Sequence, residues 1–365
     1  MTVRVNKSSF NIREKLSELG RKFGLKGSEL VAAETVQEAR DVISAGRKNL
    51  VINGNMMISQ RYGFNSPQTV TNANGYYLDR FVLRENTDGA FQVRQSSPGY
   101  PFDNAMQINV TTADTSLSGA QYARIQYYVE GNDARAVDWG KFESKDHLTL
   151  SFWVKSNAPG DYHVSIENSN NNYYPIMIKK YTIEKSDAWQ KVVVTFPPTG
   201  EYNFHRGTGI GLRITWSLAI GSSYHTGADS WFTSSYKMST STQRNFMDSA
   251  GNNFYMTGVQ LERGRNATDF EHRPYAEELR LCERYFEYST AGTGRFYTVR
   301  NDGISRGTVT WRTPKRASPN SVTLTHSNPG GWSSAGVLGS DMYGMDFGSS
   351  SNYSNFASYS CDAEL

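Results

Sequence analysis

The chain has 365 residues and a formal net charge of +3, and 13% of its residues are aromatic against 20% charged. Binding to nucleic acid needs a concentrated basic face, and no run of Lys or Arg stands out, so we expect no nucleic-acid partner. No window approaches the ~18 apolar residues of a membrane helix, and the polar N-terminus does not resemble a signal peptide, so we expect no membrane insertion. The two cysteines and six histidines are scattered, which predicts no metal site and no cofactor.

The composition favours short strands. Tyr, Val, Thr and Phe suit pleated surfaces, while abundant Gly, Asn and Ser suit turns. We therefore expect a mainly β protein: an antiparallel β-sandwich (jelly-roll) domain plus a smaller C-terminal β domain, with a short helical N-terminal stem and a connector helix. The predicted parts are an N-terminal attachment arm and helical stem at 1–47, the jelly-roll β-sandwich at 48–274, the connector helix at 275–287, and the C-terminal β tip domain at 288–365.

The N-terminal segment begins with TVRVNKSSF, which alternates like a strand but stands alone, so it could pair only with the sheet edge of another protein. The helical stem that follows has a thin apolar stripe, which favours packing against copies of itself or a partner. The residues predicted to contact that partner are Val3, Val5, Phe10, Ile12 and Leu16.

The middle domain carries the clearest strand patterns. The apolar residues of LTLSFWVKS that share one face are Leu148, Leu150, Phe152 and Val154. We assign Trp153 and Trp189 to the core because they are embedded in apolar strands. The segment FYMTGVQLE at 254–262 is predicted to close the domain, and its face changes phase at Gly258, which indicates a bulge.

The connector helix at 275–287 follows Pro274 and carries Glu277 and Glu278 in its first turn, where they suit the helix dipole. It is too short to be stable alone, so its apolar face must dock on a neighbouring domain or on sister helices around an axis. The residues predicted to form this trimer contact are Leu279, Cys282 and Phe286.

The stretch 326–360 holds ten Ser, six Gly, three Asn and three Tyr. Rigid aromatic rings among small polar residues are typical of antibody paratopes, and the alternative is an ordinary Ser-rich tail. Sugar rings pack on aromatic faces, so loop aromatics here and in the middle domain are candidate glycan or receptor contacts. The candidates, weighed evenly against structural roles, are Trp332, Tyr343, Tyr353, Tyr359, Trp216, Tyr224 and Trp231.

An enzymatic alternative is a glycan depolymerase, which needs two carboxylates ~5–10 Å apart. The carboxylates available to it are Asp229, Asp248, Glu262, Asp269 and Glu271. Arg263 and Arg265 lie between Glu262 and Asp269, so salt bridges are the simpler interpretation. We expect no catalytic residues and no enzymatic activity.

Three segments together resemble bacteriophage tail-fibre and virion structural proteins, above all those of marine and cyanobacterial phages. They are GRKNLVINGNMMISQR at 46–61, GYYLDRF at 75–81 and FYMTGVQLERGRNATDFEHRPYAEELRLCERYF at 254–286. The start, MTVRVNKSSFNIREKL, resembles the particle-attaching head of such fibres. The resemblance implies a middle domain like a carbohydrate-binding-module jelly roll, and it supplies no catalytic residues.

The resemblance also implies a function. We expect a homotrimeric tail fibre of the virion, synthesised in the host cytoplasm. Its N-terminus would attach to a tail adaptor, nozzle or baseplate protein, and its distal β domains would adhere to a polysaccharide or receptor of the host surface. The alternatives are a purely structural virion or collar protein without receptor binding and, less favoured, the depolymerase.

Overall fold

The computed structural model describes residues 47–135, 147–168, 175–199, 205–233, 237–289, 299–301, 304–326, 335–349 and 356–365. The chain divides into two compact units, 1–48 and 49–365, and the second contains nearly all of these residues. The predicted attachment residues Val3, Val5, Phe10, Ile12 and Leu16 and the helical stem lie outside the described residues, as do Trp332 and Tyr353. In the described ranges, no helix has both the length and the apolar character to cross a membrane.

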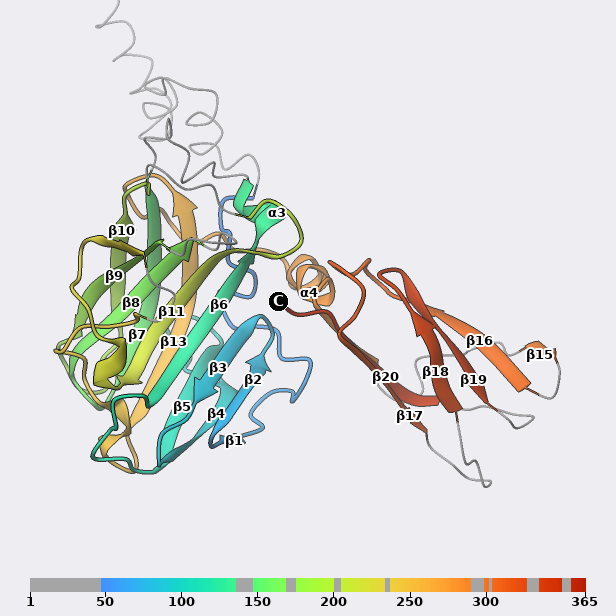
Figure 1. Ribbon diagram of the computed structural model, residues 1–365, viewed down its shortest axis with the longest axis horizontal. Helices are drawn as coiled ribbons and strands as arrows, with labels where there is room; N and C mark the ends of the chain where they lie inside the picture. Colours follow the sequence, from blue (N-terminus) through green and yellow to red (C-terminus); the bar gives the residue numbers. More distant parts are fainter. Residues whose placement is uncertain are drawn as a thin grey trace, which may run out of the picture. The chain divides into compact units, whose positions relative to one another are not determined.

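Two antiparallel sheets form the sandwich (Figure 1). The six-stranded sheet runs, in spatial order, β1 (Gln68–Val70), β4 (Ala90–Ser96), β5 (Ala105–Thr112), β13 (Asn253–Arg263), β7 (Leu148–Ser156) and β10 (Gln190–Phe196). The seven-stranded sheet runs β12 (Trp231–Thr233), β9 (Pro175–Ile183), β8 (Gly160–Asn168), β11 (Ile210–Ile220), β6 (Tyr122–Glu130), β3 (Phe81–Glu85) and β2 (Ala73–Leu78). Short helices α3 (Gly131–Ala134), η2 (Ser222–Tyr224) and η3 (Phe246–Asp248) lie in the connections. The mainly β jelly-roll prediction is confirmed.

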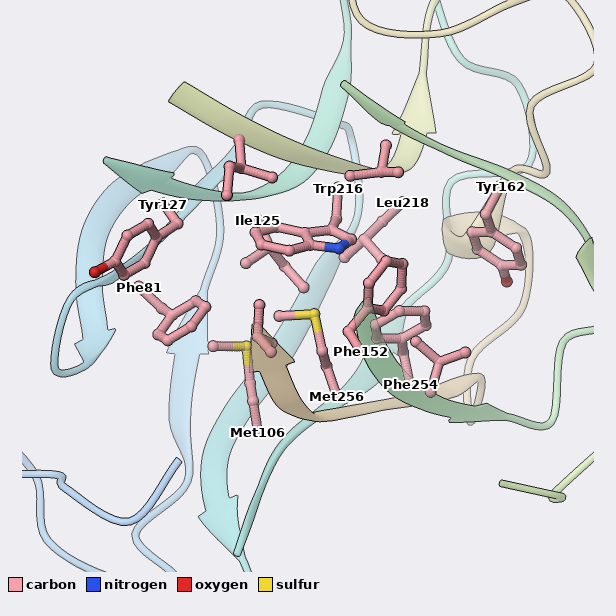
Figure 2. Close-up of a cluster of buried hydrophobic side chains, with 14 of the residues drawn as sticks. Phe81, Met106, Ile125, Tyr127, Phe152, Tyr162, Trp216, Leu218, Phe254 and Met256 are labelled. Atoms are coloured by element: carbon pink, nitrogen blue, oxygen red, sulfur yellow. The ribbon is translucent and has the colours of Figure 1, made fainter. Parts of the chain in front are cut away.

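The core lies between the two sheets because each strand alternates apolar and polar residues. The apolar face of β7 is buried as predicted, and it meets the inward face of β11. Trp216 lies at the centre, fully buried, with its ring 5.8 Å from that of Phe152 and 6.4 Å from that of Phe81 (Figure 2).

The phase change predicted at Gly258 is confirmed. The pairing of β13 with β7 shifts register between Thr257 and Gln260, and Gly258 has a φ of 59°. A Cβ at this position would lie 2.4 Å from the Phe102 ring, so both the backbone conformation and the close approach require glycine.

The connector helix α4 (Tyr275–Glu283) is confirmed, but it ends before Phe286, which begins strand β14 (Phe286–Ser289). Its apolar face is covered by the same chain: Cys282 is 1% exposed and packs in a cluster with Ile52 and Ile58, and Leu279 lies against that cluster. The trimer-contact prediction is therefore wrong for Cys282 and Phe286, which are buried within the chain and not available to sister helices, while for the partly exposed Leu279 it stays a prediction.

The segment 49–58 contains no strand. It is a turn held by side chains. Asn53 has a φ of 61°, and its amide nitrogen donates to the carbonyls of Ile58 at 2.8 Å and Asp79 at 2.9 Å. These hydrogen bonds satisfy buried backbone groups that a ladder would otherwise pair.

The C-terminal domain contains two further antiparallel sheets among its described residues. One comprises β14, β20 (Phe356–Asp362) and β17 (Ser321–His326). The other comprises β15 (Val299–Asn301), β16 (Ile304–Thr310), β19 (Gly344–Ser349) and β18 (Ala335–Ser340). A small core of Val309, Trp311, Met345, Phe347 and Tyr359 lies between them. The predicted smaller C-terminal β domain is thus present.

Contacts with the sandwich hold the C-terminal domain at both ends of its sequence. At the first end, Arg284 donates to Glu130 at 2.7 and 3.0 Å. At the second end, the residues after β20 reach the sandwich: Arg61 donates to Asp362 at 2.9 Å, and the buried Arg80 pairs with the buried Glu364. The domain is therefore attached at both ends, and Arg316, between β16 and β17, adds a third contact by donating to the Thr208 carbonyl at 2.9 Å.

Candidate functional site

The clearest hollow among the described residues of the C-terminal domain is an open groove of about 370 Å³. Strands β16, β18 and β19 form it, and its lining residues are Thr308, Thr310, Gly339, Ser340, Asp341, Tyr343, Gly344, Met345 and Asp346. Tyr343 is 60% exposed, so the ring presents a broad free face beside hydroxyl and carboxylate groups. An aromatic face among convergent polar groups is the chemistry that sugar rings require.

Hydrogen bonds from neighbouring residues hold the turn that carries Tyr343 in place. One carboxylate oxygen of Asp341 accepts hydrogen bonds from the backbone N–H groups of Tyr343 at 2.7 Å and Gly344 at 3.0 Å. The indole N–H of the buried Trp311 donates to the Asp341 carbonyl at 2.9 Å, and the Trp311 N–H donates to the Tyr343 carbonyl. The groove is thus built on a fixed turn, and little ordering is needed when a ligand binds.

The two carboxylates of the groove have separate partners. Asp341 is bound to its own turn, whereas Asp346 accepts a hydrogen bond from Thr308 across the β16–β19 pair at 2.7 Å. Both side chains are exposed and keep free acceptor positions, which suits hydrogen bonds from ligand hydroxyls.

Among the aromatic residues predicted to bind a ligand, Tyr343 lines the groove. Tyr359 is 6% exposed; its ring lies 5.6 Å from Trp311 and its hydroxyl donates to Glu287 at 2.6 Å. Trp216 is fully buried in the sandwich core. The predictions for Tyr359 and Trp216 are therefore wrong, because neither ring can meet a ligand.

The other two middle-domain candidates, Trp231 and Tyr224, are partly buried. Trp231 packs against the core of the sandwich. Tyr224 lies in η2 with its ring edge-on to Tyr122, 5.7 Å between ring centres. The structure does not bring either residue to the groove, which lies in the other domain.

A second surface of sugar-binding chemistry lies on the outer face of the six-stranded sheet. Strand register places Arg94 opposite Gln107, Gln107 opposite Tyr255, and Tyr255 opposite Lys155, so these side chains form one row across four strands. The Lys155 amine lies 4.3 Å from the centre of the Tyr255 ring and 5.4 Å from that of Trp189. Directly opposed side chains on one face are close enough to contact a single extended ligand.

Trp153 extends this surface, together with Tyr100, whose ring is 65% exposed and 6.1 Å from the Trp153 ring. We call the surface formed by Arg94, Tyr100, Gln107, Trp153, Lys155, Trp189 and Tyr255 the aromatic row. The assignment of Trp153 and Trp189 to the core was wrong, since both are partly exposed. The sequence pattern already indicated the outward position, because Trp153 alternates with Phe152 and Val154, which face the core.

The carboxylates of the enzymatic alternative have individual partners. Asp229 pairs with Lys179 at 2.7 Å, Asp248 with Arg244, and Glu271 with Arg273 at 2.6 Å. Glu262 accepts a hydrogen bond from the Thr268 hydroxyl at 2.6 Å. These contacts give each of the four a structural role. Within the described part of the chain, His, Cys, Asp and Glu side chains form no group suited to a metal ion.

No protein-family model matches the sequence, and no curated protein matches it. Solved structures similar to the chain include the enzymatically active domain of tailspike protein 4 of bacteriophage CBA120, at 11% identity and a TM-score of 0.30, covering 59% of this chain and 21% of that one. They also include the family 11 carbohydrate-binding module of Lic26A-Cel5E of Clostridium thermocellum, at 12% identity and a TM-score of 0.29, covering 56% and 98%.

A third is the CBM22-1 xylan-binding domain of Paenibacillus barcinonensis Xyn10C, at 12% identity and a TM-score of 0.29, covering 61% of this chain and 100% of that one. The chain spans about a fifth of the tailspike domain and nearly all of the two modules.

Proposed function

We propose that this protein is an adhesin of a bacteriophage tail fibre that binds a polysaccharide of the host cell surface without cleaving it. The observation that carries the proposal is the groove on the C-terminal domain, where the exposed Tyr343 ring stands beside Asp341, Asp346 and two threonine hydroxyls. A ring face with flanking acceptors and hydroxyls gives stacking and hydrogen bonding to one sugar at a time.

The aromatic row supports the same function on the other domain. It offers stacking surfaces in Trp153, Tyr255 and Trp189 and a charged donor in Arg94, along a line across the strands. The buried Gln107 accepts a hydrogen bond from Arg94 at 3.0 Å and so holds that side chain in the row. Two weak sites on one chain, multiplied by the copies in a fibre, raise avidity without any new contact. Strong adhesion therefore does not require either site to bind tightly.

The virion role rests on the sequence resemblance of 46–61, 75–81 and 254–286 to phage tail fibres. We place attachment to a tail adaptor, nozzle or baseplate protein in residues 1–47. We also place assembly of the homotrimer in this segment, because the α4 face is filled by its own chain. Sedimentation of the full-length protein at micromolar concentration checks the trimer, and a monomer would contradict it.

Adsorption of fluorescently labelled full-length protein to intact cyanobacterial cells and to arrayed surface polysaccharides tests the adhesin. The decisive variant is Tyr343→Ala, with Tyr275→Ala as its matched control, since Tyr275 on α4 is also 60% exposed but lies outside both surfaces. We expect Tyr343→Ala to lose about tenfold in affinity for the bound glycan and Tyr275→Ala to bind like the wild type.

Three outcomes would change the proposal. If Tyr343→Ala binds normally while Trp153→Ala does not, adhesion belongs to the aromatic row. If the folded wild type adsorbs to no cell and no glycan, the purely structural virion role takes its place. If reducing sugars appear in the same samples and vanish with Asp341→Asn or Asp346→Asn, the protein is a depolymerase.

A further inference from the structure

The outer face of the seven-stranded sheet has a different chemistry from the two surfaces above. Its β3, β6 and β11 strands carry three arginines, Arg84, Arg124 and Arg213. Register places Arg84 opposite Arg124, so two like charges face each other across neighbouring strands. Like charges directly opposite destabilise a sheet, so the arrangement calls for a compensating group.

The three guanidinium groups have too few anionic partners. Arg213 donates to the buried Glu167 at 2.8 and 3.0 Å. Arg84 donates to the hydroxyl of Tyr128 at 3.1 Å. Arg124 donates to the Met238 sulfur at 2.5 Å and lies over the Tyr122 ring at 4.2 Å. Among the described residues, neither Arg84 nor Arg124 has a carboxylate within ion-pair distance, so one carboxylate serves three positive charges.

Each of the three arginines also has a buried Nε atom without a hydrogen-bond partner. A buried donor without a protein partner is costly, so the cluster has unused hydrogen-bonding capacity. Burial, together with the positive charges of Arg84 and Arg213, lowers the pKa of Arg124 from its ordinary value, while the Tyr122 and Tyr128 rings oppose the shift.

The side chains that lie between the arginines are polar and are held by hydrogen bonds to one another. Tyr128 donates from its hydroxyl to Gln126 at 3.0 Å, and Gln126 donates to the Thr215 hydroxyl at 3.0 Å. All three side chains are 3% exposed, so they hold one another in place rather than adapt to a ligand. Arg213 lies over the Tyr128 ring at 5.6 Å, which places this ring between two guanidinium groups.

We propose that this face, which we call the arginine face, binds the carboxylate groups of an acidic polysaccharide. Guanidinium groups bind carboxylates through paired, charge-assisted hydrogen bonds. The cluster extends over three adjacent strands, and its width across them is therefore about 10 Å. A single carboxylate cannot span that distance. A chain that carries carboxylates on successive sugars matches that extent. The site is separate from the groove and does not depend on the adhesion proposed for it.

Calorimetric titration of the full-length protein with polygalacturonate, and with neutral dextran of similar length, tests the site. We expect polygalacturonate to bind and dextran not to bind at this face. Arg84→Gln and Arg124→Gln are expected to weaken polygalacturonate binding about tenfold each, because each removes a charged hydrogen-bond donor. Lys185→Gln removes the same charge from an exposed loop position and is expected to have no effect.

A stability measurement separates binding from support of the fold. Arg124 is a partly buried charge without an anion, so Arg124→Gln should leave the melting temperature of the free protein unchanged or raise it. Tyr343→Ala should bind polygalacturonate like the wild type, which keeps this test independent of the groove. The proposal is overturned if Lys185→Gln weakens binding as much as Arg124→Gln, if dextran binds the Tyr343→Ala variant as well as polygalacturonate does, or if Arg124→Gln melts far below the wild type.

Discussion

The guanidinium carbon of Arg80 lies 3.4 Å from the centre of the Tyr285 ring, with both side chains fully buried. Arg80 comes from the segment 75–81 and Tyr285 from the segment 254–286, so two of the three stretches that resemble phage fibres meet in this contact. Arg80 also donates to the Tyr128 carbonyl at 2.7 Å and pairs with Glu364. The stacked arginine thus joins the sandwich to both attachments of the C-terminal domain.

The third stretch, 46–61, reaches the same junction. Asn53 donates its backbone N–H to Glu278 of α4, and Gln60 donates to Asp79 at 2.6 Å. Arg273 completes the contact by pairing with Glu278 at 3.2 Å. The three segments therefore meet in one buried polar junction, where a charged group left without a partner would be costly.

We expect Glu364→Gln to lower the free energy of unfolding by about 3–5 kcal/mol, because it leaves Arg80 buried without its anion. Chemical denaturation monitored by tryptophan fluorescence measures the change. Lys180→Ala is the matched control, since it breaks an exposed pair with Asp161 and should cost less than about 1 kcal/mol. Equal costs in the two variants would contradict the role of the junction.

Stability should fall at acidic pH through Glu130. Burial disfavours its charge, but hydrogen bonds from Arg284, Tyr285 and Asn132 hold the pKa of Glu130 below its ordinary value in the folded state. The stabilisation is therefore present above the unfolded pKa of 4.5 and is lost as the pH falls through the lower folded value.

Glu130→Gln should consequently destabilise the protein by about 3 kcal/mol at pH 7 and by less at pH 3. Unfolding free energies of wild type and variant across this range measure the effect. The control is Glu184→Gln at an exposed position, which should show no such trend. A difference that stays constant from pH 7 to pH 3 would show that the Glu130 charge is not stabilising.

Both thiols should be inert in the folded protein. Burial, with the nearby carboxylates of Asp79 and Glu278, raises the pKa of Cys282 well above its ordinary value, and burial raises the pKa of Cys361 to about 12. Only the thiolate is nucleophilic, so a colorimetric disulfide reagent at pH 8 should not react with native protein and should react with two thiols after denaturation. Rapid modification of the native state would contradict the burial of either cysteine.

Truncation of Trp216 should cost much more stability than truncation of Trp153. Trp216→Ala removes a fully buried indole and is expected to cost about 3–5 kcal/mol through the cavity it leaves. Trp153→Ala acts on the outer face and should cost about 1 kcal/mol or less. Denaturant titration of both variants checks the contrast, and a large loss at Trp153 would return that residue to the core.

Local pattern predicted the strands and the bulge, because alternation and glycine act within a few residues. The same alternation places Trp216 on one face with the apolar Ile214 and Leu218, which indicates a core position rather than a loop position. The position of Tyr359 could not be read in this way, because its burial depends on Trp311, nearly 50 residues earlier in the chain.

The sites depended on pairings between distant strands. The aromatic row draws Gln107, Lys155 and Tyr255 from three strands, and the arginine face draws Arg84, Arg124 and Arg213 from three others. Register between such strands is set by the packing of the whole sandwich, so no short stretch of sequence encodes it. Tyr343 lies in the turn between β18 and β19, so its place beside the groove follows from one hairpin, whereas Thr308 and Thr310 come from β16.

The attachments of the C-terminal domain have a mechanical consequence. In the proposed adhesin, a pull on a sugar at Tyr343 passes to the sandwich through the Arg284–Glu130 and Arg80–Glu364 contacts and through the hydrogen bond from Arg316 to Thr208. These contacts come from different parts of the chain, so the loss of one of them would leave the others in place. Anchoring at several points would suit the proposed adhesin, whose binding domain must keep its position under load.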